Sequence, residues 1–307
     1  MARFVPDSKT GRWVIIAPTR VTRPHDNPPS PGNDLASEGQ APLCPFCPGN
    51  EKLNPIELFR VGGMPGDPNW QIRVITNKFP ITDLHEVIIH SPDHDKDIDA
   101  LPLTQVELIL KTYRQRYNFH MAAKNGKVLI FNNHDEHAGA SIKHPHSQLV
   151  VIPGQIHLEV LPREPEQNVV VKTKYFTVYC PDFSQWPYEI WLAPQCHAGL
   201  DPASISIDSG SEAGMTNNTF GAITDDEIKD LASILQKLLG IIISKFKREE
   251  KDVPYNYYIH HAQDWYLRII PRLIHRAGFE LGTGLSVNIV DPAKAAEEYK
   301  QGLEIRA

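Results

Sequence analysis

Two histidines and a glutamine lie at alternating positions in one short stretch of the chain. His144, His146 and Gln148 are followed directly by the apolar residues 149–152, which favour a buried β-strand. Because side chains alternate across a strand, we expect the three polar groups to project from one face. A neutral imidazole can attack phosphorus and form a covalent N–P intermediate, while an amide donates hydrogen bonds to phosphoryl oxygens. The alternative is a pair of surface histidines on an edge strand.

Cys44 and Cys47 are a second group of residues whose types suit a specific chemistry, either metal binding or a redox reaction. The chain has four cysteines, and only these two are close in sequence. Two thiolates from one tight turn suit a tetrahedral zinc ion, and in a reducing compartment such a pair is read as metal ligands or as a redox pair. The βαβ context of a thioredoxin-like redox site is missing, which favours a metal. The motif alone does not identify the other two ligands.

Composition restricts the class of protein. The 307 residues are 41% hydrophobic and carry a formal net charge of −6, so the chain can bury a full core but has no basic field to collect nucleic acid. No run of 18 apolar residues and no secretory h-region is found, so we expect no membrane span. These features predict a cytoplasmic protein.

The elements that position these residues recur in the sequence. Residues 86–94 form a short apolar segment that ends in proline and then histidine, and residues 189–197 repeat this pattern. A capping box follows each copy, starting at Thr104 and at Thr224, and predicts the start of an amphipathic helix. Core-facing residues at i, i+3 and i+4 spacing then appear in both helices. They are Val106, Leu108, Ile109, Leu110 and Tyr113 in the first, and Ile228, Leu231, Ile234, Leu235 and Leu238 in the second.

Two strand candidates follow each helix. They are residues 127–132 and 149–152 in the first copy, and residues 255–260 and 266–270 in the second. This order predicts an α+β fold with two copies of one unit, each an antiparallel sheet with a helix packed on it. We place the division between a catalytic domain, 1–165, and a second domain, 166–307.

Together these motifs resemble the signature of the histidine-triad superfamily, most closely its galactose-1-phosphate uridylyltransferase branch. In that branch an Asn, a Gly and a Ser precede His-Pro-His-(Gly/Ser)-Gln. This chain has residues of the same types in those places without a gap, and the similarity extends from residue 13 to about residue 298. The matching residues are Asn133, Gly139, Ser141, His144, Pro145, His146 and Gln148.

The resemblance assigns roles to these residues. It implies that His146 is the catalytic nucleophile, with Gln148 and Ser141 as catalytic hydrogen-bond donors to the phosphoryl group. Asn133 and Gly139 would then contact the substrate. In the hydrolytic relatives a third histidine, which can protonate a leaving group, stands in place of the glutamine.

Further substrate contacts are implied outside the signature. Asn77 lies in a segment that resembles the family's nucleotide-binding Thr-Asn, although Lys78 stands where an acidic residue usually holds the ribose. Arg20 and Arg23 resemble the arginines near the substrate phosphates. Independently of the resemblance, the rings of Phe46 and Phe79 are suited to stacking on a nucleotide base.

The same resemblance completes the metal site. In the family the third ligand comes from a Ser-Pro-Asp-His segment and the fourth from the first histidine of His-Pro-His. Here these are His94 and His144, beside Cys44 and Cys47. Four protein ligands leave no open position, so the implied cofactor is one structural Zn²⁺ ion.

The glutamine in the motif favours one type of reaction. A sugar phosphate has a second pKa of about 6 and departs as a stable anion without an acid, so Gln148 can orient the phosphoryl group without donating a proton. This predicts ping-pong nucleotidyl transfer between phosphates through nucleotidyl-His146. The resemblance implies UDP-glucose as the donor and galactose 1-phosphate as the acceptor.

The C-terminal half of the sequence indicates an alternative function. Thr283 and Gly284, within residues 278–288, stand where the uridylyltransferases carry Tyr-Glu in their sugar-phosphate loop. This stretch resembles the variant branch that includes ADP-glucose phosphorylases, so an ADP-sugar or dinucleotide phosphorylase using inorganic phosphate is the close rival. A zinc-stabilised nucleotide-binding module without catalysis is a third reading. Because the family's loop reaches the partner's active site, a homodimer is expected.

The second copy lacks the catalytic motif. Residues 263–268 replace His-Pro-His-Ser-Gln, and Arg268 occupies the place of a second metal site found in some family members. We therefore predict that this second metal is absent, and that His197, His260 and His261 are structural.

Overall fold

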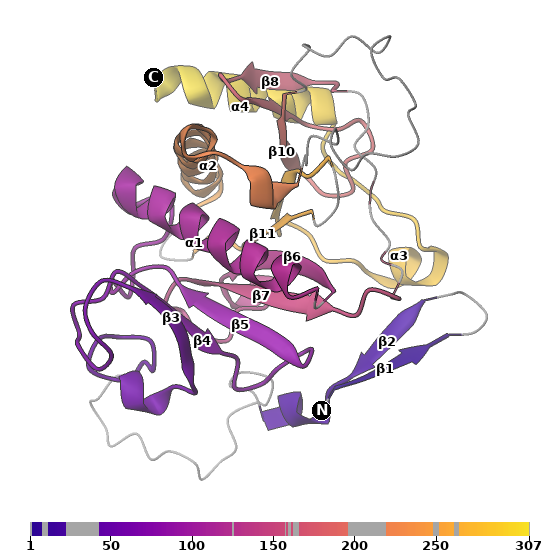
Figure 1. Cartoon of the computed structure of the whole chain (residues 1–307). Helices are drawn as coiled ribbons and strands as arrows, with labels where there is room; N and C mark the ends of the chain where they lie inside the picture. Colours follow the sequence, from indigo (N-terminus) through magenta and orange to yellow (C-terminus); the bar gives the residue numbers. More distant parts are fainter. Residues whose placement is uncertain are drawn as a thin grey trace, which may run out of the picture.

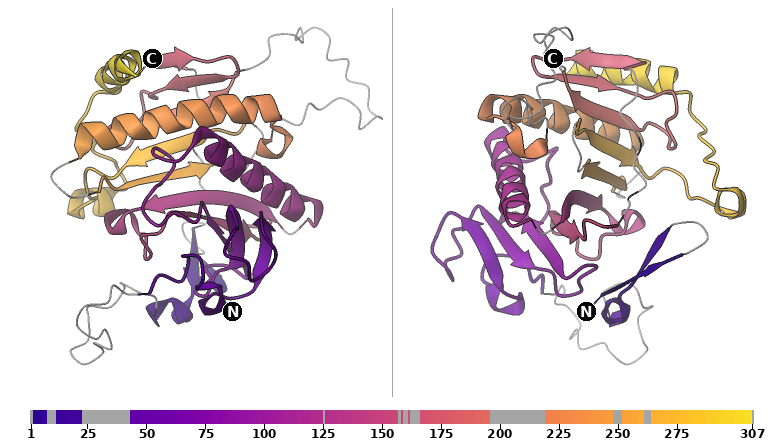
Figure 2. Two further views of the ribbon diagram at one scale, coloured as in Figure 1. Left: turned by 90° about the vertical axis from the view of Figure 1, so that its left-hand side faces the viewer. Right: turned by 45° about the vertical axis from the view of Figure 1, so that its right-hand side comes forward.

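One antiparallel sheet with two long helices on one face makes up the body of the molecule (Figures 1 and 2). The computed structural model describes residues 2–7, 12–22, 43–124, 126–156, 158, 161, 166–195, 219–247, 252–260 and 264–306. Within these residues the large sheet has ten strands. They are β3 (Glu57–Val61), β4 (Ile72–Thr76), β5 (Leu84–Ile89), β6 (Lys127–His134), β7 (His146–Ile152), β8 (Val169–Lys172), β9 (Phe176–Tyr179), β10 (Ile190–Pro194), β11 (Tyr255–Ile259) and β12 (Leu267–Pro271).

The strand order shows the duplication. The order is β3-β4-β5-β7-β6-β11-β12-β10-β9-β8, and every neighbouring pair is antiparallel. Read from each outer edge to the centre, the two halves have the same order of strands, and they meet where β6 pairs with β11. The predicted α+β fold of two repeated units is therefore confirmed. The domain division at residues 165 and 166 stays a prediction, and residues 162–165 lie outside the described residues.

Each half contributes one long helix, and both helices cover the same face of the sheet (Figure 2, left). Helix α1 (Leu103–Ala122) follows β5, and α2 (Asp225–Phe246) follows β10. The predicted helix stripes are buried, apart from the partly buried Leu108, and join strand residues in one core cluster. The helices are thus held by burial of an apolar stripe, each large side chain contributing about 1.5–3 kcal/mol.

One of the two predicted capping boxes is present. Thr224 caps α2, accepting a hydrogen bond from the backbone of Glu227 while the Glu227 carboxylate accepts one from the backbone of Thr224. The box predicted at Thr104 is wrong: α1 begins at Leu103 after Pro102, which makes no side-chain cap. The carbonyl of Pro102 accepts hydrogen bonds from the N–H groups of Gln105 and Val106, so the helix starts before the threonine.

Smaller elements flank the sheet. A hairpin of β1 (Arg3–Pro6) and β2 (Trp13–Ile16) forms a separate two-stranded sheet, and its Phe4 and Trp13 pack against a cluster that includes Val150 of β7. Helix α4 (Pro292–Ile305) lies beside β8 (Figure 1), whereas α3 (Gly278–Thr283) lies apart from the sheet. In the part of the chain that the structure describes, none of the helices combines the length and apolarity that crossing a bilayer requires.

A buried ion cluster connects α1 to β5. Two nitrogens of the Arg116 guanidinium group, Nε and Nη2, donate to the Glu86 carboxylate at 2.9 and 2.5 Å, and His120 Nε2 lies 2.7 Å from Glu86 Oε1. Burial alone would raise the pKa of Glu86, but the hydrogen bonds from His120 and Arg116 lower it below its ordinary value. Glu86 is therefore ionised at neutral pH and depends on its partners.

The variant Arg116→Met tests this dependence. Removing one partner leaves a buried charge without compensation, so we expect the free energy of unfolding to fall by about 3–5 kcal/mol. The matched control is Lys111→Met on the same helix, whose ion pair with Asp225 is partly exposed and is worth about 0–1 kcal/mol. Urea unfolding of both variants measures the difference, and equal losses would contradict the assignment.

Candidate active site and metal cluster

His146 begins β7 and has a fixed ring orientation. Its Nδ1 lies 3.0 Å from the carbonyl oxygen of His144, so Nδ1 carries the proton and Nε2 carries the lone pair. Burial lowers the pKa of His146 to about 4, although the hydrogen bond from the ring to His144 opposes the effect. The imidazole is therefore neutral at pH 7, which is the state required of a nucleophile.

A cavity of about 440 Å³ opens beside this ring. It collects five of the residues predicted from the sequence: Phe46, Asn77, Ser141, His146 and Gln148. The rest of its lining is largely apolar and includes Leu43, Leu53, Ile75, Phe79, Val87 and Ile142. A mostly apolar pocket with a few convergent polar groups is typical of a small-molecule site.

The ring of Phe46 forms part of the pocket wall. It contacts the rings of both His144 and His146 edge-on, with centroids 6.1 and 5.3 Å apart. The two imidazoles therefore lie on the same side of the strand entrance. Arg20 reaches this region too, because its Nη1 donates to the carbonyl of Phe79 at 2.7 Å.

Other predicted contact residues lie outside the pocket lining. Gly139 follows the turn after β6 with φ +92°, a conformation that favours glycine, and Asn133 donates to its carbonyl at 3.5 Å. Thr283 and Gly284 lie at the end of α3, where Thr283 Oγ1 donates to the Phe279 carbonyl. Arg23 falls outside the described residues. The roles assigned to all these residues stay predictions.

The structure adds one buried residue that the sequence analysis missed. His85 on β5 is 4% exposed, and its Nε2 lies 2.9 Å from Gln148 Oε1. The pairing of β5 with β7 brings the two side chains together, since Val87 is the register partner of Gln148. In the sequence, His85 is only a single histidine directly before the repeated segment 86–94. Nothing in that position indicates that it contacts Gln148.

The four predicted metal ligands converge in a separate cluster. One ligand atom from each of Cys44, Cys47, His94 and His144 lies within 4.8 Å of all the others. Cys47 Sγ is 3.3 Å from His94 Nδ1 and 3.6 Å from His144 Nδ1. Tetrahedral zinc with its usual bond lengths requires S···N separations of about 3.6 Å, so these residues fit a four-coordinate metal.

The surroundings of the cluster orient its ligands. His144 Nε2 donates to the carbonyl of Ser91 at 2.8 Å, which leaves the Nδ1 lone pair facing the cysteines, as is usual around a metal-bound histidine. Burial lowers the pKa of His144 to about 4, against the effect of that hydrogen bond. The Cys44 end is held by Asn50 Nδ2, which donates to the Cys44 carbonyl at 2.8 Å.

Behind the nucleophile, the opposite face of β7 carries a buried polar network. Ser147 Oγ lies 2.8 Å from His90 Nε2 and also contacts the hydroxyls of Tyr113 and Tyr257. His90 Nδ1 lies 3.0 Å from Asp97 Oδ1. Two sets of contacts therefore hold β7. The polar network packs against the face opposite His146, and the ligand cluster holds His144, which directly precedes the strand in sequence.

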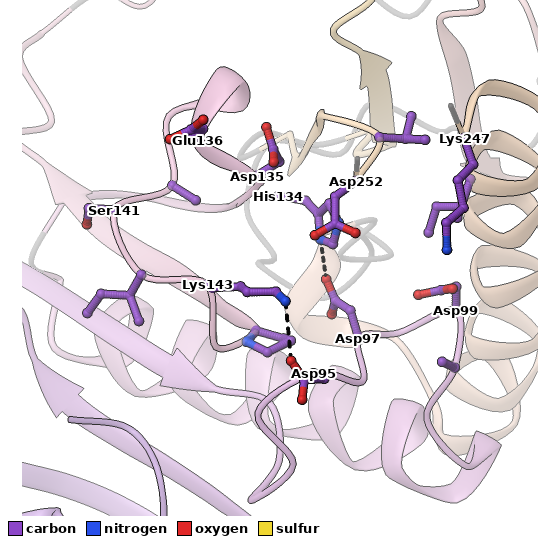
Figure 3. Close-up of a pocket in the computed structure, with 16 residues that line it drawn as sticks. Asp95, Asp97, Asp99, His134, Asp135, Glu136, Ser141, Lys143, Lys247 and Asp252 are labelled. Carbon is purple, nitrogen blue, oxygen red and sulfur yellow. Dashed lines mark hydrogen bonds and ion pairs between the residues drawn. The ribbon is translucent and has the colours of Figure 1, made fainter. Parts of the chain in front are cut away.

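Asp97 extends this network to a second cavity, of about 490 Å³, which shares Ser141 and Ile142 with the first (Figure 3). His134 Nδ1 lies 2.9 Å from Asp97 Oδ2, and its ring stacks on Tyr255. Burial alone would lower the pKa of His134, but Asp97, Asp252 and Asp99 raise it above its ordinary value. Hydrogen bonds and charge from His134 and His90 hold the pKa of Asp97 well below its ordinary value, although burial opposes them.

Comparisons with known proteins support the resemblance. The model of the family described as galactose-1-phosphate uridyl transferase, N-terminal domain, matches residues 83–152. An ADP-glucose phosphorylase of Arabidopsis thaliana is 27% identical over 353 residues, covering 96% of this chain and 91% of the relative. A galactose-1-phosphate uridylyltransferase of Thermotoga maritima is 23% identical, covering 95% and 96%.

Solved structures agree with this relationship. The crystal structure of the Arabidopsis thaliana ADP-glucose phosphorylase with bound ADP-glucose superposes with a TM-score of 0.68 at 26% identity, covering 98% of this chain and 99% of that one. A uridylyltransferase structure has a TM-score of 0.69 at 21% identity, covering 100% and 99%, and shows the common fold.

The fold and the site together define a protein of duplicated histidine-triad-like units. Residues 83–152 match the galactose-1-phosphate uridyl transferase family model, and the chain is similar along most of its length to an ADP-glucose phosphorylase and to a galactose-1-phosphate uridylyltransferase.

The raised pKa of His134 makes stability depend on pH. A histidine whose pKa is higher in the folded state stabilises fully below its unfolded pKa, about 6.5, and loses this contribution as the pH rises through the folded value. We therefore expect the destabilisation caused by His134→Asn to be larger at pH 6 than at pH 9. Urea unfolding of wild type and variant across this range measures the difference, and a penalty that grows with pH would contradict the charged Asp97–His134 pair.

Proposed function

We propose that this protein transfers a nucleoside monophosphate from a nucleotide-sugar to a phosphate-bearing acceptor, through a covalent nucleotidyl-His146 intermediate. The observation that carries the proposal is the orientation of His146, whose Nδ1–H is held by the His144 carbonyl at 3.0 Å beside an open cavity. In the first step Nε2 attacks the phosphorus joined to the nucleoside, and the sugar phosphate departs as an anion. In the second step an acceptor phosphate oxygen attacks the same phosphorus and releases His146.

The polar groups of the pocket suit this exchange. Gln148 and Ser141 line the cavity with His146 and are proposed to donate hydrogen bonds to the phosphoryl oxygens as charge builds there. Asn77 and Phe46, in the same wall, are proposed to contact the nucleoside. Arg20 and Arg23 are proposed to lie near the phosphates, and Asn133 and Gly139 to shape the loop that carries Ser141.

Two acceptors follow from the family. The uridylyltransferase reading gives UDP-glucose as the donor and galactose 1-phosphate, or another hexose 1-phosphate, as the acceptor. The phosphorylase reading gives an ADP-sugar or a dinucleotide as the donor and inorganic phosphate as the acceptor. Similarity to the Arabidopsis thaliana ADP-glucose phosphorylase across 96% of the chain supports the second, as does the Thr283-Gly284 sequence in place of Tyr-Glu. We therefore propose ADP-glucose phosphorolysis as the activity to be tested first.

The cluster of Cys44, Cys47, His94 and His144 is proposed to hold one structural zinc ion. Because all four positions would be filled by protein, the ion supplies stability and no Lewis-acid step. It would fix the segment before β7, and with it the carbonyl that orients His146. We further propose a homodimer in the cytoplasm; Leu281 and Phe279 of α3 are 77% and 55% exposed and could pack against a partner.

Trapping the covalent intermediate tests the proposed function. The protein is incubated separately with ADP-glucose and with UDP-glucose, and mass spectrometry identifies the nucleotide attached to it. Inorganic phosphate or galactose 1-phosphate is then added, and the released product names the acceptor. We expect AMP on the protein and ADP as the product with inorganic phosphate, whereas uridylylation followed by UDP-galactose would establish the first reading.

Two variants test whether His146 is the residue that carries the nucleotide. His146→Asn should form no adduct and lose at least about 10³-fold in turnover, because no other group can supply the nucleophile. His137→Asn changes an exposed histidine of the neighbouring loop and should react as wild type does. If His146→Asn were equally active, the mechanism would be wrong, and if wild type bound nucleotide without reacting, the protein would be a binding module.

Metal content tests the ligand cluster. Purified protein should contain one equivalent of zinc, and Cys44→Ala should lose it and unfold at a lower temperature. The control is Cys180→Ala, which removes a fully buried cysteine of the core outside the cluster and should keep one equivalent even where it costs stability. Elemental analysis and thermal unfolding measure both effects; retention of zinc in Cys44→Ala would disprove the ligand set.

A further inference from the structure

His85 lies on β5, the strand that pairs with β7 and so with His146, and the proposed mechanism does not use it. It is 4% exposed on β5, where its register partner is Val150, and Ile89 on the same strand is the partner of His146. Because side chains alternate along a strand, His85 and Ile89 face the same side of the sheet. His85 is absent from the residues that line the cavity, so it can act only through a neighbour.

The backbone fixes which nitrogen of His85 carries the proton. The N–H of Ile81 donates to His85 Nδ1 at 3.0 Å. A backbone N–H can only donate, so Nδ1 must accept and the ring proton lies on Nε2. The turn before β5 therefore selects one neutral tautomer.

This tautomer in turn fixes Gln148. His85 Nε2 lies 2.9 Å from Gln148 Oε1, and with its proton there it donates to that oxygen. Asn77 Oδ1 accepts from the N–H of Phe79 at 2.7 Å, so Asn77 Nδ2 is a donor, and it lies 3.2 Å from His85 Nε2 and 3.5 Å from Gln148 Oε1. Because a protonated Nε2 cannot accept, Asn77 Nδ2 is left to donate to the Gln148 oxygen. Two donors thus converge on the Gln148 oxygen.

The consequence concerns the other end of the amide. An amide can present either its oxygen or its NH₂ group to the pocket, and an oxygen facing a phosphoryl group would repel it. With Oε1 bound by His85, the Gln148 NH₂ group is left to face the substrate. We propose that His85 is a positioning residue for phosphoryl transfer, selecting through its Nε2–H the rotamer of Gln148 that donates to the transferred phosphate. This inference rests on the proposed function.

A double-mutant cycle tests the coupling. His85→Phe keeps a buried ring but removes the donor, and we expect kcat for nucleotide loading to fall about 10- to 100-fold, with KM changed less than about threefold. This is less than the about 10²- to 10³-fold for loss of a donor that contacts the substrate directly, because Gln148 is still present. His85→Gln can place an N–H near the position of Nε2 and should restore most of the rate. In a Gln148→Met background, His85→Phe should have no further effect on kcat.

The measurements separate positioning from a structural role. Loading of His146 is followed in single turnovers with ADP-glucose and with UDP-glucose, and the thermal stability of each variant is recorded. Equal rate losses from His85→Phe with and without Gln148 would overturn the proposal, as would no rescue by His85→Gln. If wild type itself forms no adduct, the proposed function fails instead, so the two failures are distinct.

A second measurement uses the unaltered protein and does not depend on any variant folding. NMR of protein with ¹⁵N-labelled histidine reports which ring nitrogens are protonated. We expect the signals of His85 to show Nε2–H and an unprotonated Nδ1 at neutral pH. A proton on Nδ1 would leave Nε2 unable to donate to Gln148 in the neutral ring and would overturn the proposal.

Discussion

The hydrogen bond between His146 Nδ1 and the His144 carbonyl is the constraint on which the site depends. It decides which nitrogen can attack, and burial keeps that nitrogen unprotonated at neutral pH. A bond from a ring to the backbone two residues earlier is only as rigid as that backbone. The rest of the structure can be understood as a means of holding residues 144–148 in place.

Two independent sets of contacts provide this rigidity. Before the strand, the His144 ring is held between the Ser91 carbonyl and the cysteine thiols. Behind it, Ser147 is tied to His90 and, through His90, to Asp97. The amide of Asn132 adds a hydrogen bond to the His146 carbonyl at 2.8 Å. Because these contacts come from several strands and from α1, misplacing any one of those elements would shift the nucleophile.

Much of the site could be predicted because its residues are close in sequence. The His144–Gln148 motif, the Cys44–Cys47 pair and the repeat of strand and helix are local patterns, and alternation along a strand determines which side chains share a face. His94 was placed with the other ligands by resemblance alone, since 47 residues separate it from Cys47. The predicted helix at Thr104 began too late because a proline carbonyl replaced the expected cap.

The contacts that could not be predicted depend on the register between strands that are distant in sequence. His85 and Gln148 are 63 residues apart, and a shift of one residue between β5 and β7 would turn His85 to the other face. The outer strands β3, β8 and β9 and the joining of both halves through β6 and β11 were not predicted either, since each requires knowing its neighbour. Whether inorganic phosphate or a hexose 1-phosphate is the acceptor depends on side chains outside the signature motif.

The central claim concerns one nitrogen atom, and its chemical identity can be measured. Protein loaded with its nucleotide-sugar is digested under alkaline conditions, and ³¹P NMR of the histidine adduct identifies the nitrogen bonded to phosphorus. The account predicts phosphorus on Nε2 of His146, because Nδ1 is held by the His144 carbonyl. Phosphorus on Nδ1, or on any other residue, would contradict it.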